Sequence, residues 1–138
     1  MSTRKQRSFR FAPETLARLE QRARELGMTH TALVERYVEE GLRQEDHWGI
    51  IFVDEPAGRR ARVGGTGLDV WEVVRIVQDN HGSTAEAAAY LDIPERLVLT
   101  AMRYYADYSY EIDAWIADND RYYEEELARQ RRVADALG

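Results

Sequence analysis

The chain has 138 residues, of which 44% are hydrophobic and 32% charged, as in an ordinary soluble protein with one medium domain or two small ones. It contains no cysteine, which excludes a disulfide framework, a thiolate nucleophile and a cysteine-ligated zinc site. No apolar run approaches the roughly 20 residues of a membrane-spanning helix. We therefore expect a cytoplasmic protein with no membrane partner.

The formal net charge of −6 is unevenly distributed along the chain. Residues 1–44 contain nine basic and six acidic side chains, whereas residues 45–138 contain ten basic and nineteen acidic ones. Arg4, Lys5, Arg7 and Arg10 open the chain with a basic cluster, and residues 107–126 hold eight acids and one arginine. The basic end favours a phosphate partner, and the acidic end favours a basic protein.

The first predicted element is a short strand that ends at Phe11. Phe9 and Phe11 alternate with polar residues, the period of two that is typical of a half-buried strand. The polar face then consists of Arg4, Gln6, Ser8 and Arg10.

Two amphipathic helices are predicted after this strand. Pro13 suits the first position of a helix that Gly27 ends, and Thr29 can cap a second helix that continues to about residue 44. A unit of about 40 residues without metal or disulfides is too small to bury an adequate core, so it should pair with its own copy. We expect a two-stranded antiparallel ribbon over four helices. Its dimer core would contain Phe9, Phe11, Leu33, Val34 and Tyr37.

Residues 4 to about 44, with the motifs SFRFAP and ELGMTHTALVERYVEEGL, resemble the ribbon-helix-helix repressors of the Arc, MetJ and CopG type. The resemblance implies that the ribbon enters the DNA major groove and that its outward residues read bases. These are Arg4, Gln6, Ser8 and Arg10, and the start of the second helix, at Thr29, His30 and Thr31, would anchor a phosphate. Ala12 departs from the family, in which a serine or threonine cap is expected. The alternative is a dimerisation module whose basic strand is merely solvated.

A β-hairpin and a helix-turn-helix are predicted from Trp48 onward. Ile50–Val53 and Arg59–Val63 flank the turn EPAG, and GGTG lacks a phosphate-loop spacing and is interpreted as a second turn. Capping boxes at Asp69 and Ser83 and a proline at position 94 mark three helix starts. The second and third helices have helix-turn-helix spacing. Arg59, Arg60, Arg62 and the third helix could touch DNA, but we favour a structural or partner-binding bundle because basic residues are sparse on that helix.

The segment Trp48–Tyr108 is similar to hairpin plus helix-turn-helix domains that recur in VapB-like antitoxins. The similarity lies in HWGIIFVDEPAGRRARV, DVWEVV and AMRYYADY, in that order. Such domains are often encoded beside a PIN-like nuclease toxin. The similarity therefore implies an antitoxin.

The acidic C-terminal segment has an apolar stripe of helical period. This helix either folds back on its own bundle or lies across a toxin, with its carboxylates facing a basic nuclease surface. Both arrangements can hold at once. The residues predicted to bind the toxin are Trp115, Ile116, Tyr122, Tyr123 and Leu127.

No enzyme chemistry emerges from the sequence. His30, His47 and His81 lie far apart without ligand spacing, and each is interpreted as a loop or surface residue. The acids Asp113, Asp118, Asp120 and Glu124 are not favoured as a metal site, because no alternation of strands and helices gathers them. We expect no cofactor and no metal.

These features predict a mainly α protein in three parts. They are a dimeric ribbon-helix-helix domain with one strand per chain (1–45), a hairpin plus helix-turn-helix domain (46–110) and a C-terminal helix (111–138). The predicted function is a DNA-binding transcriptional repressor that is also the antitoxin of a type II pair and neutralises a PIN-like ribonuclease. The alternative is a ligand-responsive regulator without a toxin partner.

Overall fold

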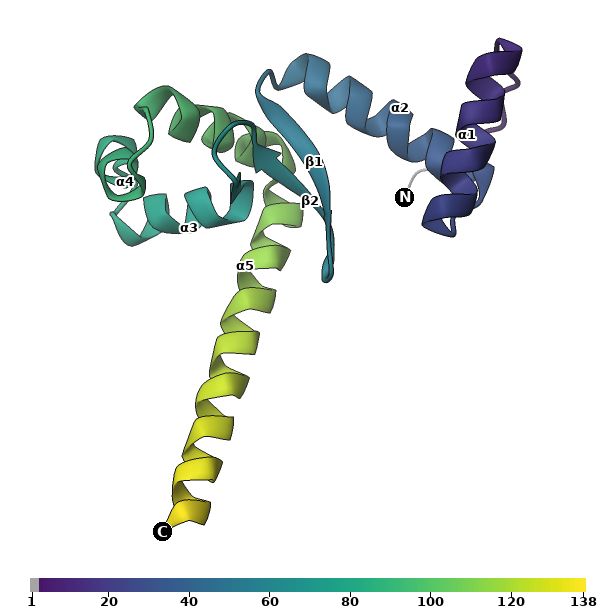
Figure 1. The fold of residues 1–138 in the computed structure, drawn as a ribbon. Helices are drawn as coiled ribbons and strands as arrows, with labels where there is room; N and C mark the ends of the chain where they lie inside the picture. Colours follow the sequence, from purple (N-terminus) through teal and green to yellow (C-terminus); the bar gives the residue numbers. More distant parts are fainter. Residues whose placement is uncertain (1–2) are drawn as a thin grey trace. The chain divides into compact units, whose positions relative to one another are not determined.

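The computed structural model describes residues 3–138 and confirms a mainly helical fold with one small antiparallel sheet (Figure 1). The chain divides into two compact units, one ending at Arg43 and the other beginning at Gln44. The first unit contains α1 (Pro13–Leu26) and most of α2 (His30–Asp46). The second unit contains three strands and three further helices.

The ends of α1 and α2 lie where the sequence predicts them. Pro13 occupies the first turn of α1, and Ala12 precedes it without a side-chain capping bond. Gly27 ends α1 in the left-handed conformation, with φ of 66°, and the next N–H donates to the Ala23 carbonyl. The Thr29 hydroxyl accepts a hydrogen bond from the Ala32 N–H at 3.1 Å and caps α2.

Residues 3–12 form neither a helix nor a strand in the single chain. A β-ladder needs a neighbouring strand to accept and donate its backbone hydrogen bonds, and this chain offers none to the segment. The ribbon therefore stays a prediction that only a second copy can satisfy.

The predicted hairpin of the second unit is confirmed. Strand β1 (Ile50–Glu55) pairs antiparallel with β2 (Gly58–Val63), and Glu55 stands opposite Gly58 across a two-residue turn. GGTG forms the second turn, as predicted. It leads into β3 (Leu68–Asp69), a strand that the sequence did not reveal because two residues carry no periodicity.

Three helices follow the sheet: α3 (Val70–Asp79), α4 (Thr84–Leu91) and α5 (Glu95–Leu137). Both predicted capping residues act at their helix starts. The Asp69 N–H donates to Glu72 at 3.0 Å, and the Ser83 hydroxyl accepts from the Glu86 N–H at 3.1 Å. Pro94 is the residue before α5 and not its first residue, because its ψ of 140° is extended.

Residues 111–138, which we expected as a third part, continue α5 within the second unit. A kink lies shortly before the predicted boundary, because Tyr108 leaves helical geometry with φ of −128° and ψ of 38°, but it does not divide the unit. The fully buried Tyr104 bridges this kink by donating a hydrogen bond to Glu111 at 2.8 Å. Ile112, beyond the kink, is buried in the same core.

The core of the second unit joins the sheet to all three helices. Tyr104 is its largest fully buried side chain. Its other buried members are Ile50, Ala61, Val63, Val70, Val73, Val74, Val77, Ala87, Ala88, Val98, Ala101 and Ile112.

His47 lies in the loop between α2 and β1, as expected, but its side chain is buried at the edge of this core and is not on the surface. Its ring packs edge-on against Tyr104 and Tyr108, with centroids 5.3 and 5.8 Å away. Its Nε2 lies 2.8 Å from a carboxylate oxygen of Asp107. Residues sixty positions away supply these partners, which is why the local sequence did not reveal them.

Asp69 is the buried carboxylate of the second unit, with 3% of its side chain exposed. It accepts hydrogen bonds from Arg60 at 3.1 Å, Arg62 at 3.0 Å and the Trp71 indole at 3.2 Å. The hydrogen bonds that Arg62 donates to Asp69 and then to Glu55 raise the pKa of Arg62 above its ordinary value. One carboxylate thus joins two strands to the start of α3.

We predict that Asp69→Ala lowers the free energy of unfolding by about 3 kcal/mol, because it takes the buried carboxylate from Arg60 and leaves Arg62 with Glu55 alone. Asp54→Ala is the matched control in the same hairpin, since Asp54 pairs with Arg59 but is largely exposed. The control should cost less than about 1 kcal/mol. Urea denaturation followed by circular dichroism measures both, and equal losses would contradict the central role of Asp69.

Candidate nucleic-acid interface and partner-binding helix

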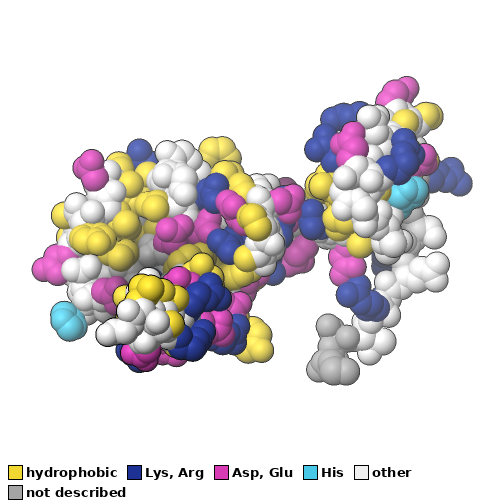
Figure 2. Space-filling view, turned by 60° about the horizontal axis from the view of Figure 1, so that its bottom comes forward, with side chains coloured by type: hydrophobic (Ala, Val, Ile, Leu, Met, Phe, Trp, Pro, Cys, Tyr) yellow, Lys and Arg dark blue, Asp and Glu magenta, His cyan; other side chains and the backbone are white. Residues whose placement is uncertain are grey.

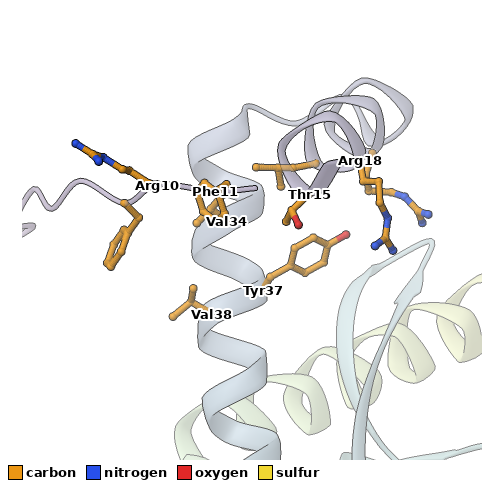
Figure 3. Close-up of a pocket in the computed structure, with 10 residues that line it drawn as sticks. Arg10, Phe11, Thr15, Arg18, Val34, Tyr37 and Val38 are labelled. Atoms are coloured by element: carbon orange, nitrogen blue, oxygen red, sulfur yellow. The ribbon is translucent and has the colours of Figure 1, made fainter. Parts of the chain in front are cut away.

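The first unit leaves most of its apolar side chains uncovered. Among its described residues only Ala23 and Leu33 are buried, whereas Phe9 is 69% exposed and Val38 is 56% exposed. A groove of about 590 Å³ opens between the segment that carries Phe11, α1 and α2 (Figure 3). Its lining consists of Phe9, Arg10, Phe11, Thr15, Arg18, Leu19, Arg22, Val34, Tyr37 and Val38.

Four of the five predicted dimer-core residues line this groove. Phe9, Phe11 and Tyr37 are exposed there, and Val34 is half-buried. Leu33 is fully buried within the single chain and does not line the groove. The groove is therefore a largely apolar surface that the rest of the first unit leaves open.

A second hollow of the same unit, the basic hollow, has a volume of about 900 Å³ and combines basic side chains with Glu35, Glu39 and six apolar residues. Arg4, Lys5, Gln6 and Arg7 line it together with His30 and Thr31 at the start of α2. It thus brings two predicted base-reading residues, Arg4 and Gln6, to the predicted phosphate anchor. Figure 2 shows basic side chains beside hydrophobic ones on the surface of this unit.

Ser8 does not line either of these hollows, and Arg10 lines the apolar groove instead of the basic hollow. The four predicted base-reading residues therefore do not share one face in the single chain. The physical reason is that strict alternation of side chains requires a β-ladder, which residues 3–12 lack.

The start of α2 favours an anion. Its first turn contains no acidic residue, and the N–H groups of a first turn have no partner within the helix. One of these N–H groups, that of Ala32, donates to the Thr29 hydroxyl. His30 and Thr31, at the start of the helix, are exposed. The turn can hold a phosphate oxygen through its remaining N–H groups and the Thr31 hydroxyl.

Arg4 is already engaged by a residue that the sequence reasoning missed. Its Nη1 donates hydrogen bonds to both carboxylate oxygens of Glu35, at 2.8 and 2.7 Å. The four-residue spacing of Thr31 and Glu35 indicates that Glu35 lies on the same face of α2 as the predicted phosphate anchor. The partner of Arg4 could not be read from this spacing.

The arginines of β2 are occupied within the second unit. Arg60 and Arg62 bind Asp69, Arg59 binds Asp54 at 3.1 Å, and Trp115 covers the Arg60 guanidinium at 4.6 Å. These contacts support the structural interpretation of this hairpin over a DNA-binding one.

The predicted toxin-binding residues of α5 fall into two groups. Trp115 and Ile116 lie half-buried against their own unit, and a Cβ atom at Gly58 would lie 3.2 Å from the Trp115 ring. Tyr122 and Tyr123 are 67% and 63% exposed, and Leu127 is half-buried. Figure 1 shows α5 leaving the sheet and α3 and continuing alone to its end. The fold-back arrangement therefore holds for the first group, and the second group stays available to a partner.

The acidic stretch is also divided. Asp107 contacts His47, Asp113 accepts from Tyr105 at 2.7 Å, and Asp120 accepts from Arg75 at 2.7 Å. The hydrogen bond to Asp120 is the main reason that the pKa of Arg75 lies above its ordinary value. These carboxylates are engaged within the second unit, and further along α5 Glu126 pairs with Arg129 at 3.2 Å.

We predict that Trp115→Ala lowers the free energy of unfolding of the second unit by about 2 to 3 kcal/mol, because it uncovers the hairpin. Tyr122→Ala, about two helical turns further along α5, should change the free energy of unfolding by less than about 0.5 kcal/mol. Urea titrations of both variants, followed by fluorescence and circular dichroism, test the division of α5. Equal losses would contradict it.

Within residues 3–138, no group of three His, Asp or Glu side chains could hold a metal ion. No helix of the same range is long and apolar enough to cross a membrane. Comparisons with protein-family models, with curated proteins and with solved structures gave no match to this chain.

Proposed function

We propose that this protein is a DNA-binding transcriptional repressor that acts as a homodimer and serves as the antitoxin of a type II toxin-antitoxin pair. The observation that carries the proposal is the apolar groove of the first unit, which lies beside a hollow lined by Arg4, Lys5 and Arg7. An uncovered apolar surface indicates a protein partner, and clustered cations indicate a phosphate partner.

A second copy is the partner that suits the groove best. Phe9 and Phe11 lie on a segment without backbone partners, and the same segment of another chain can pair with it antiparallel. The two-fold relation would place the phenylalanines of each chain over the α2 residues Val34 and Tyr37. Pairing would also restore the alternation that the single chain lacks.

In such a dimer Arg4, Gln6, Ser8 and Arg10 would share the outer face of a ribbon. Arginine can bind guanine through two hydrogen bonds and glutamine can bind adenine in the same way, so this face suits the major groove. The starts of the two α2 helices would bind phosphates on either side and fix the register.

The partner-binding role is proposed for the part of α5 beyond the second unit's core. Tyr122 and Tyr123 are large, exposed and carried by a helix that continues without the rest of its unit. Exposed aromatic residues on a helix are common anchors for a groove on a partner protein. The similarity of Trp48–Tyr108 to antitoxin domains makes a PIN-like ribonuclease the proposed partner.

The proposal is tested by selecting DNA from a random double-stranded library with the full-length protein and sequencing the retained fragments. A two-fold dimer should enrich an inverted repeat with two half-sites. A monomer in sedimentation experiments that enriches no sequence would overturn the DNA-binding role.

At the selected site, Arg10→Ala should weaken binding by about 1 to 3 kcal/mol if Arg10 reads a base, and wild-type affinity should fall steeply as salt rises. Arg103→Ala in the second unit removes the same charge from an exposed position on α5 and serves as the control. Fluorescence anisotropy measures both dissociation constants. Equal losses would show that the ribbon is misassigned.

The double variant Tyr122→Ala, Tyr123→Ala should lose at least about tenfold in affinity for the product of the neighbouring gene. Tyr90→Ala, an exposed tyrosine on α4, is the matched control and should retain binding. Co-expression, co-purification and a growth assay measure the effect. A neighbouring product that is harmless and forms no complex would remove the antitoxin role and leave the ligand-responsive regulator as the alternative.

A further inference from the structure

A long-range ion pair of the first unit joins a predicted DNA-binding residue to an acid on α2. Arg4 and Glu35 are 31 residues apart, and one Arg4 nitrogen donates to both oxygens of the Glu35 carboxylate. Both side chains are largely exposed, at 85% and 56%, so solvent and DNA can reach the pair.

We infer that Glu35 competes with DNA for Arg4 and thereby lowers the affinity of the protein for DNA. The inference rests on the proposed function, because it concerns the same basic surface. A carboxylate and a phosphate bind a guanidinium through the same charge-assisted hydrogen bonds. A phosphate or a guanine must therefore compete with Glu35 for the donors of Arg4 Nη1 and for its charge.

The position of Glu35 strengthens this competition. Glu35 lines the basic hollow together with Lys5, Arg7 and Thr31. A DNA strand that neutralises these cations would bring its phosphates close to the Glu35 carboxylate, and these like charges would repel each other. Glu35 thus acts on the free protein, by holding Arg4, and on the complex, by opposing phosphate.

Glu39 provides an internal control. It lies one helical turn after Glu35 on α2 and lines the same hollow. Its carboxylate accepts a hydrogen bond from Arg43 at 2.9 Å, so it does not hold Arg4. Neutralising Glu39 removes the same charge from the same surface without releasing the arginine.

The test measures fluorescence anisotropy of a short labelled duplex of mixed sequence, titrated at low salt with the full-length protein and its variants. Glu35→Gln should bind about three- to fivefold more tightly than the wild type, the range expected for an exposed ion pair. Glu39→Gln should gain clearly less. In an Arg4→Ala background the two glutamine variants should bind equally.

Glu35→Asp separates contact from charge, because it keeps the charge and shortens the reach to Arg4. It should also bind DNA more tightly than the wild type, and circular dichroism checks that each variant is folded. Equal affinities of Glu35→Gln and Glu39→Gln, with the wild type bound to DNA, would overturn the inference and leave the proposed function in place. A wild type that does not bind DNA would overturn both.

Discussion

The first unit has more apolar surface than one copy of it can bury. Two short helices and an unpaired segment enclose only Ala23 and Leu33, while Phe9, Tyr37 and Val38 stay exposed. Burial of apolar area is the main favourable contribution to folding, and a unit of this size has too little interior to supply it alone. The proposed association would therefore affect both the stability of this unit and the geometry of its basic surface.

The second unit satisfies the same requirement within one chain. Its sheet and three helices enclose a continuous core, and its charged groups are mostly engaged in specific pairs, with Asp69 joining the strands to α3 and Asp120 joining α5 to α3. Buried charges need such partners, because desolvation without compensation is costly. The long helix α5 thus starts from a unit that has its own core.

The helix α5 links this unit to the proposed partner surface. Before and just after the kink at Tyr108 it contributes buried residues such as Tyr104 and Ile112, and further on it carries exposed tyrosines. The same helix thus packs against the core in its first part and exposes aromatic side chains in its later part. Charge is divided in the same way, since the acids nearest the core already bind His47, Tyr105 and Arg75.

The sequence by itself determined the local elements of this protein. Helix α1 begins at Pro13 and ends before Gly27, and Thr29 and Ser83 cap their helices. The hairpin around Pro56 also pairs as predicted. The sequence reveals these features because each depends on residues a few positions apart. The boundary predicted after residue 110 does not divide two parts, because α5 kinks at Tyr108 but continues within the second unit.

Only the tertiary structure decided which distant side chains meet. It buries His47 against Tyr104, places Trp115 over Gly58 and joins Arg4 to Glu35. It also separates Arg10 from Arg4, which a paired strand would place on one face. Such contacts depend on how helices and strands pack across tens of residues, and the short-range spacing that reveals caps and turns contains no information about them.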